Sequence, residues 1–265
     1  MGAIPSDVAT GDLDADGALD VLVAAYEDDE VSWFANDLSL RAVISTEAGP
    51  ESVRAADLDD DGDLDVVVAA FEADRVVWHE NDGGSFGPAI EIGTMDGPIS
   101  IRGADFDHDG DADLLVASSE DDTVRWFENE GGEFVEHILT TEADGAAQAL
   151  PIDLDRDGFQ DVVIAARLGN RIIAFHNDQG TFAGPEIIAT GVEGVRELAA
   201  ADLDGDLDLD LVSVSVFDDR ILIHHNPSDQ YGNIDTRPGS CGCGSNGSKA
   251  GFLLLLWPWM SRSRR

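Results

Sequence analysis

Apolar and polar residues alternate along most of this chain with the periods of β-strands. Runs such as Val66–Ala70 are short, apolar and rich in β-branched residues, which is typical of a buried strand. In the runs that follow, hydrophobic residues occupy every second position, as Val76 and Trp78 do, so they share one face of a strand. Asp, Asn and Gly separate the runs and favour turns. No useful length of helical periodicity occurs before residue 228, and the pattern predicts an all-β fold.

The strands belong to a repeat that occurs five times. The aligned segments are "DVLVAAYEDDEVSWFAND", "DVVVAAFEADRVVWHEND", "DLLVASSEDDTVRWFENE", "DVVIAARLGNRIIAFHND" and "DLVSVSVFDDRILIHHNP". Asn closes the second strand of every copy (Asn36, Asn81, Asn129, Asn177 and Asn226), and stretches such as "GSFGPAIEIG" and "SVRAADLD" supply two more strands. The copies are 45, 48, 48 and 49 residues apart, the period of a propeller blade with four strands. We therefore expect a β-propeller of about five four-stranded blades, the fifth lacking one strand.

An acidic nonapeptide precedes each aligned segment. The five copies are "DLDADGALD", "DLDDDGDLD", "DFDHDGDAD", "DLDRDGFQD" and "DLDGDLDLD". Carboxylates this close repel one another unless a cation neutralises them. The odd spacing lets a curved loop turn three carboxylates inward, and Gly at position 6 permits the bend. The carbonyl of position 7 and the carboxylate of position 9 can then complete the shell.

Calcium is the cation that such a loop suits best. It takes about six to eight oxygen ligands in irregular geometry, whereas Mg²⁺ prefers a strict octahedron and keeps its waters. An EF-hand is excluded, because position 12 holds Val23, Val68, Val116, Ile164 and Ser213 in place of Glu, and strands flank the loop. Isolated Asp-Gly clusters are also compatible with solvated turns, but five in register favour metal ligation. The predicted metal ligands are Asp12, Asp14, Asp16, Asp20, Asp57, Asp59, Asp61, Asp65, Asp105, Asp107, Asp109, Asp113, Asp153, Asp155, Asp157, Asp161, Asp202, Asp204, Asp206 and Asp210.

The motif D-x-D-x-D-G-x-x-D, followed by a valine-rich strand, resembles the FG-GAP/VCBS repeat family over residues 4–227. Members form calcium-binding β-propellers like the head of the integrin α-subunit, commonly with seven blades. The resemblance implies up to five Ca²⁺ ions, with side-chain ligands such as those of Asp57–Asp65 and the Asp63 carbonyl completing that site. The fifth loop departs from the pattern, because Leu207 replaces the Gly of position 6 and Gly205 sits two places early. We expect that loop to bend less readily and its site to be the weakest.

Composition excludes two classes of partner. The chain has 15 basic and 55 acidic residues and a formal net charge of −40. Nucleic acids and anionic membranes both require basic surface, so we expect neither as a partner. The two Cys residues lie at 241 and 243, so the repeats have no disulfide framework and no Cys-based zinc site.

The two ends of the chain differ from the repeats. We expect a propeller over residues 1–228, a linker with Cys-Gly-Cys over 229–249, and a hydrophobic segment with an Arg cluster over 250–265. The apolar run is shorter than the roughly 20 residues of a spanning helix, and the order of the three parts resembles MYXO-CTERM sorting tails. That resemblance implies contact with a membrane only through the tail before processing, and a final place at the cell surface or outside the cell.

The first residues leave two alternatives open. "MGAIPSDV" has neither a basic n-region nor an apolar h-region, so no signal peptide is present in these residues. Either five blades close a small ring, or an N-terminal piece with a signal peptide and further blades has been lost.

The sequence favours a surface-linked binding or adhesion module whose ligand is an extracellular protein or a glycan. The alternative is a carbohydrate-active protein on the same propeller, either a lectin or a polysaccharide-degrading enzyme. No G-x-S-x-G, no H-E-x-x-H and no Cys nucleophile occur in the repeats, and the His residues are scattered, so we expect no enzymatic activity. Trp33, Trp78 and Trp126 share one column that alternates with Val, which favours packing between blades over ligand stacking.

Overall fold

The computed structural model describes residues 4–226, which form five antiparallel β-sheets, numbered here as blades 1 to 5. Blade 1 contains β1 (Pro5–Gly11), β2 (Asp20–Ala25), β3 (Glu30–Phe34) and β4 (Leu40–Ser45), with the 3₁₀ turn η1 (Tyr26–Asp28). Blade 2 contains β5 (Pro50–Ala56), β6 (Asp65–Ala70), β7 (Arg75–His79) and β8 (Ile90–Thr94). Blade 3 contains β9 (Pro98–Ala104), β10 (Asp113–Ser118), β11 (Thr123–Asn129) and β12 (Phe134–Thr140). Blade 4 contains β13 (Ala146–Ile152), β14 (Asp161–Ala166), β15 (Arg171–Asp178) and β16 (Thr181–Thr190), and blade 5 contains β17 (Val195–Ala201), β18 (Asp210–Ser215) and β19 (Arg220–His224).

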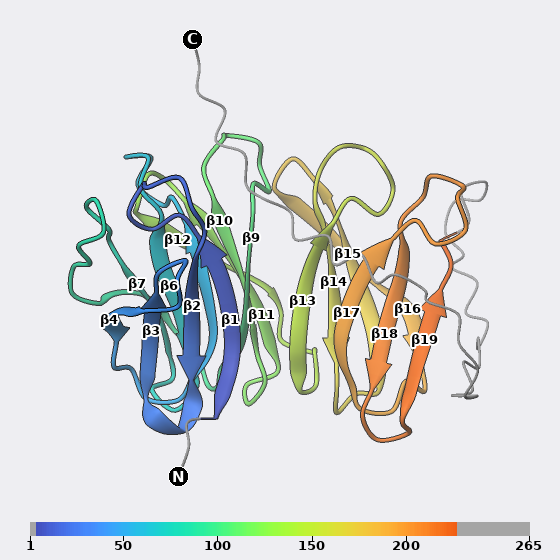
Figure 1. Ribbon diagram of the computed structural model, residues 1–265. Coiled ribbons are helices and arrows are strands. Elements are labelled where there is room, and N and C mark those ends of the chain that lie inside the picture. The colour runs from blue at the N-terminus through green and yellow to red at the C-terminus, as the bar shows by residue number, and fades with distance from the viewer. Residues whose placement is uncertain (1–3, 227–265) are drawn as a thin grey trace.

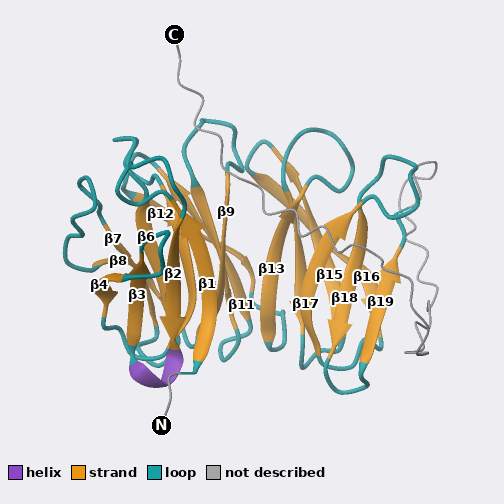
Figure 2. Cartoon of the chain, in the orientation of Figure 1, coloured by secondary structure: helices purple, strands orange, loops and turns teal. Residues whose placement is uncertain are grey.

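The blades lie around a common axis with their first strands innermost (Figures 1 and 2). Each sheet keeps the order of the sequence, and each acidic loop joins the innermost strand to the second strand of the same blade. The predicted all-β propeller is confirmed, and within residues 4–226 blade 5 has three strands, as its missing repeat strand predicts. In the same residues no helix has the length and apolar character needed to cross a membrane.

The core consists of four apolar clusters, one between each pair of neighbouring blades. Alternation along the strands explains this, because residues of one parity face the preceding blade and those of the other parity face the next. In β6, for example, Val66 and Val68 pack towards blade 1, while Val67 packs towards blade 3, all fully buried. The Trp column lies in these clusters at 4–5% exposure (Trp33, Trp78 and Trp126), which confirms its packing role.

The five blades leave two apolar faces uncovered. None of the four clusters joins blade 5 to blade 1 within the described residues. Blades 1 and 5 lie on opposite sides of Figure 1, and β9 and β13, the inner strands of blades 3 and 4, are seen between them. Ile221 in blade 5 is 53% exposed, whereas Val76 at the same repeat position of blade 2 is fully buried. Val8 in blade 1 is 60% exposed, whereas Val53 at its position in blade 2 is buried. The described blades therefore form an open arc and do not close a five-bladed ring.

The open arc predicts unequal effects of one substitution at equivalent positions. Val76→Thr places a hydroxyl in a fully buried inter-blade cluster and should lower the free energy of unfolding by about 1–3 kcal/mol. Ile221→Thr changes an exposed side chain and should cost less than about 0.5 kcal/mol. Urea denaturation of both variants checks this, and equal losses would show that another surface covers blade 5 in solution.

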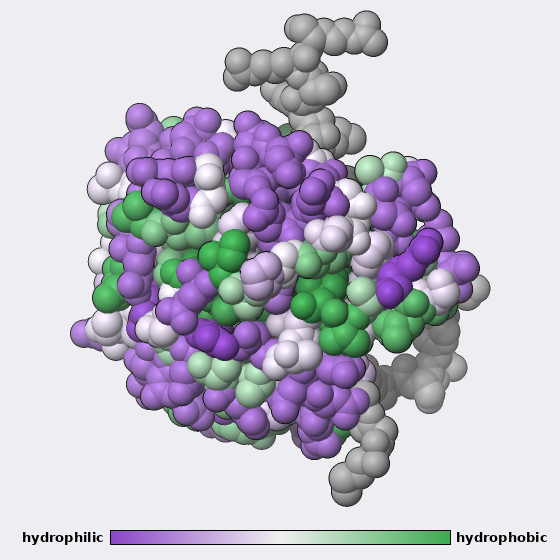
Figure 3. Space-filling view, turned by 90° about the vertical axis from the view of Figure 1, so that its left-hand side faces the viewer, coloured by the Kyte–Doolittle hydropathy of each residue, from purple (hydrophilic) through white to green (hydrophobic). Residues whose placement is uncertain are grey.

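The outermost strands complete the surface. β4, β8, β12 and β16 expose some of their apolar side chains, such as Val43, Ile90, Ile138 and Ile187. Figure 3, which views blade 1's side of the molecule, shows hydrophilic side chains over both loop-bearing ends and apolar side chains in a band between them. One of these two ends carries the acidic loops, and the other carries the tight turns between the second and third strands.

Candidate metal-binding loops

The five acidic loops lie at one end of the propeller, which is the upper end in Figure 1. Positions 4 and 6 of every loop have positive φ. At position 4 the φ value is 55–65° in loops 1 to 4 and 85° at Gly205 of loop 5. In loop 2 these residues are Asp60 (φ 60°) and Gly62 (φ 98°). A Cβ is disfavoured at such φ values, which explains the Gly of position 6. The bend turns the loop back on itself, so that alternate side chains point inward.

Backbone hydrogen bonds hold two carboxylates of each loop in place. In loop 2, the N–H of Gly62 donates to Asp57 Oδ2 at 3.1 Å, and the N–H of Asp63 donates to Asp61 Oδ1 at 2.9 Å. The same two contacts occur in loops 1, 4 and 5. In loops 2 and 4 the position-1 carboxylate keeps its second oxygen without a donor, whereas in loops 1 and 5 that oxygen accepts another backbone N–H, from Asp16 at 3.1 Å and from Gly205 at 2.7 Å.

The Asp of position 9 begins the second strand and is buried. Asp65 is fully buried, and its two oxygens accept the N–H of Leu58 at 2.9 Å and of Asn81 at 2.8 Å. Burial raises the pKa of Asp65 to about 7, against the lowering effect of these two N–H groups. Burial likewise raises the pKa of Asp113 to about 6. A nearby cation would favour the ionised form of both groups.

Several carboxylate oxygens of the loops are buried without any hydrogen-bond donor. They are Oδ1 of Asp14, Asp57, Asp59, Asp105 and Asp153. A buried carboxylate oxygen without a partner is costly, and a cation removes that cost. The loops also bring ligand atoms within 4.8 Å of one another, in the groups Asp12–Asp14–Asp16, Asp57–Asp59–Asp61, Asp105–Asp107–Asp113, Asp155–Asp161–His176 and Asp204–Asp210–His225. Each of the five loops thus contributes to an acidic cluster that could hold a metal ion.

The composition of these clusters differs from loop to loop. In loops 1 and 2 the residues of positions 1, 3 and 5 come together, and in loop 3 those of positions 1, 3 and 9. In loops 4 and 5 the residues of positions 3 and 9 come together with a His. The donors are mainly carboxylate oxygens, which suits a hard cation such as Ca²⁺.

The following blade covers the first three loops. Gly84, in the hairpin of blade 2, lies over Asp14 and Trp33 of blade 1, and a Cβ built on it would be 3.3 Å from each. Gly132 and Gly180 take the same place over Asp59 and Asp107. These glycines let one blade's backbone approach the acidic loop of the blade before it. Loop 5 has no such cover among the described residues.

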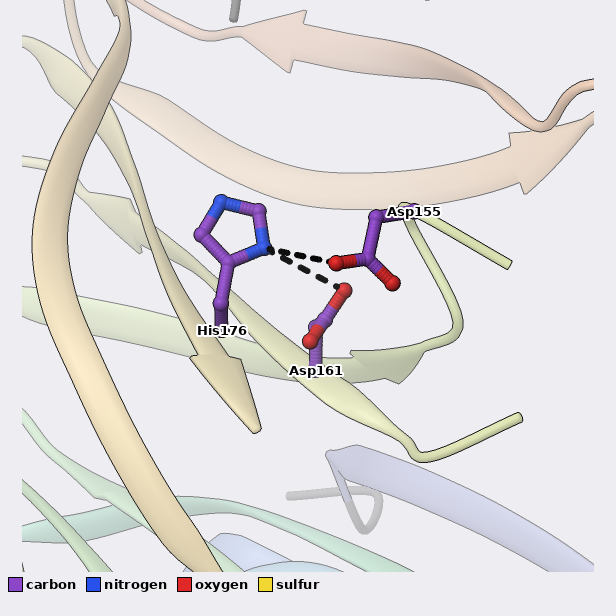
Figure 4. A group of neighbouring side chains, drawn as sticks. All are labelled: Asp155, Asp161 and His176. Atoms are coloured by element: carbon purple, nitrogen blue, oxygen red, sulfur yellow. Dashed lines mark ion pairs between the residues drawn. The ribbon is translucent and has the colours of Figure 1, made fainter. Parts of the chain in front are cut away.

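His176 lies beside loop 4 and was not predicted as part of it. Its Nδ1 is 3.9 Å from Asp155 Oδ2 and 3.6 Å from Asp161 Oδ2 (Figure 4). Burial alone would lower the pKa of His176, but a hydrogen bond to Glu186 and the charge of Asp161 outweigh it and raise that pKa. Its Nε2 lies 2.9 Å from Glu186 Oε2, so carboxylates flank both nitrogens of the imidazole ring.

A sequence signal for this residue existed. His225 lies in the same repeat column as His176, directly before the closing Asn, and its Nδ1 is 3.6 Å from Asp204 Oδ2 and 3.3 Å from Asp210 Oδ1. Aligning the His residues with the repeat, rather than treating them as scattered, would have placed both beside acidic loops.

Loop 5 forms the bend that its sequence disfavours. Leu207 has φ 77° and Gly205 has φ 85°, and the N–H of Leu207 still donates to Asp202 Oδ2 at 3.1 Å. A left-handed Leu costs about 1–2 kcal/mol. The expectation of a strained position 6 is therefore correct, but the loop does bend. Loop 5 differs more from the other loops in its exposure, since Asp202, Asp204 and Asp206 are all exposed.

The closing Asn residues join neighbouring blades at these loops. Asn129 Nδ2 donates to the carbonyl of Leu58 in loop 2 at 2.9 Å and to that of Ala112 in loop 3 at 3.2 Å. Its Oδ1 accepts the N–H of Gly132 at 2.8 Å. Asn81 and Asn177 make the same three contacts. The repeat alignment shows that Asn recurs at this position, but it does not predict that the side chain joins two neighbouring blades as an inter-blade clasp.

Comparison with known proteins agrees with this architecture. Four overlapping segments, residues 12–68, 57–116, 105–164 and 153–213, match the FG-GAP-like repeat family, and the chain belongs to that family. No curated protein matches the chain.

Solved structures share the fold at low sequence identity. A lectin of Agrocybe aegerita, described as recognising non-reducing terminal N-acetylglucosamine, is 20% identical, with a TM-score of 0.58 over 85% of this chain and 63% of its own. The V. cholerae biofilm matrix protein Bap1 is 18% identical, with a TM-score of 0.56 over 88% of this chain and 38% of its own. Virginiamycin B lyase of Staphylococcus aureus, an inactive variant with quinupristin, is 14% identical, with a TM-score of 0.60 over 91% and 71%. The chain thus spans less than two thirds of the first two proteins.

Proposed function

We propose that the protein is a calcium-stabilised binding module that acts at the cell surface or outside the cell. The observation that carries the proposal is the set of buried carboxylate oxygens without hydrogen-bond donors in the acidic loops. Ca²⁺ would be held by the four Asp residues of a loop, such as Asp57, Asp59, Asp61 and Asp65, with the fifth loop the weakest site. Bound ions neutralise the repulsion within each loop and stabilise the blade junctions.

A binding role is supported by two of the structural neighbours. One is a lectin and another a biofilm matrix protein, and both present a propeller of this kind. The ions are structural in this proposal, because a shell built largely from carboxylates leaves little room for a substrate. The ligand is an extracellular protein or a glycan, and no catalytic turnover is expected. Export and surface linkage are part of the proposal, while residues 229–249 and 250–265 lie outside the described residues.

Retention on surfaces tests this function. The fluorescently labelled full chain is incubated in 1 mM Ca²⁺, on the order of extracellular levels, with insoluble polysaccharides and with immobilised extracellular matrix proteins. We expect retention on at least one surface, weaker retention in EGTA, which removes the ions that stabilise the blades, and no release of reducing ends. Release of reducing ends would favour the polysaccharide-degrading alternative, and absence of retention on every surface would contradict a binding module.

A further inference from the structure

A hollow of about 650 Å³ opens at the centre of the face opposite the acidic loops. All five blades contribute to it: Tyr26 from blade 1, Phe71 from blade 2, Glu120 from blade 3, Arg167 from blade 4 and Arg196 from blade 5. A position where every blade converges, with a volume in the range of small-molecule sites, is where a propeller can assemble a binding site from distant segments. The acidic loops lie at the other end, so this hollow is separate from the candidate metal sites.

Two aromatic rings form an apolar part of its wall. The ring centroids of Tyr26 and Phe71 are 6.2 Å apart at an angle of 57°, and both side chains are half-buried. The Tyr26 hydroxyl donates to Glu72 Oε1 at 2.9 Å, which fixes its ring. Phe71 packs across Gly97, where an added Cβ would be 2.8 Å from the Phe71 ring. The two rings are thus held in place and still present part of their surface to the hollow.

Polar groups of both kinds line the remainder. Glu120 and Asp144 offer acceptors, while Arg167 and Arg196 offer donors. Within residues 4–226 neither guanidinium forms an ion pair, so their N–H groups remain free for a ligand. A ligand that fits must carry an apolar face and, at its edge, groups that both donate and accept hydrogen bonds.

We propose that this hollow binds a short neutral saccharide. This proposal rests on the proposed binding function and assigns a site and a ligand class to it. A pyranose ring has an apolar C–H face for Tyr26 and Phe71, and hydroxyls that donate to carboxylates and accept from guanidinium groups. Acidic sugars are disfavoured, because the lining holds five carboxylates (Glu51, Asp96, Glu120, Asp122 and Asp144) against two Arg. The excess of carboxylates attracts cations, but a purely cationic ligand such as a polyamine carries only hydrogen-bond donors and leaves both guanidinium groups without an acceptor.

Calorimetry on the full chain in Ca²⁺ tests the proposal. The probes are cellobiose, N,N′-diacetylchitobiose, mannobiose and lactose, with digalacturonic acid and spermidine as charged comparisons. We expect at least one neutral disaccharide to bind, and Phe71→Ala to weaken it by about tenfold or more. Arg167→Gln should also weaken disaccharide binding. This second variant keeps the proposal testable if Phe71→Ala lowers the thermal midpoint, because Arg167 is not a core residue.

Phe217→Ala is the matched control. Phe217 occupies a second-to-third-strand turn of blade 5, is 61% exposed and does not line the hollow, so its variant should bind within about twofold of the parent. Binding of spermidine alone, or of no neutral disaccharide, would overturn the saccharide assignment. Saccharide binding that Phe71→Ala and Arg167→Gln leave unchanged would place the site elsewhere. Both outcomes leave the proposed binding function standing if the chain is still retained on surfaces.

Discussion

Chelation of Ca²⁺ by EGTA should lower the thermal midpoint of the protein by about 20 °C or more. An ion at 100 times its dissociation constant stabilises the folded chain by about 2.7 kcal/mol, so four filled loops supply about 11 kcal/mol. In a domain of this size each kcal/mol shifts the midpoint by about 2–4 °C. Differential scanning calorimetry with Ca²⁺ and with EGTA measures the shift. An unchanged midpoint would exclude the structural role of the ions.

A single-loop variant gives the graded control for chelation. Asp61→Ala removes a carboxylate from loop 2 while the hydrogen bond from Gly62 to Asp57 is retained. The variant should bind one ion fewer, and its free energy of unfolding in Ca²⁺ should fall by about 2–3 kcal/mol. In EGTA, where no ion is bound, its free energy of unfolding should change little. Asp206→Ala in loop 5 should lose less, because that loop is exposed and its position 6 is strained.

Much of this architecture follows from local pattern. Strand alternation, the repeat period and the acidic nonapeptides predict the blades, the inter-blade Trp packing and the five loops, because each depends on residues close together in the sequence. The blade boundaries follow from the same period, since the strand before each acidic loop pairs with the strand after it, as Ala56 pairs with Asp65.

Contacts between neighbouring repeats are what the sequence did not reveal. Asn129 of blade 3, for example, reaches the carbonyl of Leu58 in loop 2, which is 71 residues earlier. A one-dimensional repeat shows that a column exists but not which neighbouring blade its side chains contact. The open arc has the same origin: apolar residues at Val8 and Ile221 fit the repeat pattern, and only the arrangement in space shows that nothing in residues 4–226 covers them.

Replacing Asn129 by Leu should lower the free energy of unfolding by about 3 kcal/mol or more. The change leaves the carbonyls of Leu58 and Ala112 and the N–H of Gly132 without their partner, in a site where Asn129 is 1% exposed. Each unsatisfied buried group costs about 1–3 kcal/mol. Urea denaturation in Ca²⁺ measures the loss.

Asn36→Leu is the control for this clasp, because the same repeat position in blade 1 is exposed and no described blade precedes it. It should change the free energy of unfolding by less than about 0.5 kcal/mol. Asn129 holds carbonyls that flank the aspartates of loops 2 and 3, so Asn129→Leu should also weaken calcium binding at both loops. Its destabilisation should therefore be larger in Ca²⁺ than in EGTA. An equal loss in both conditions would show that the clasp joins the blades without positioning the metal ligands.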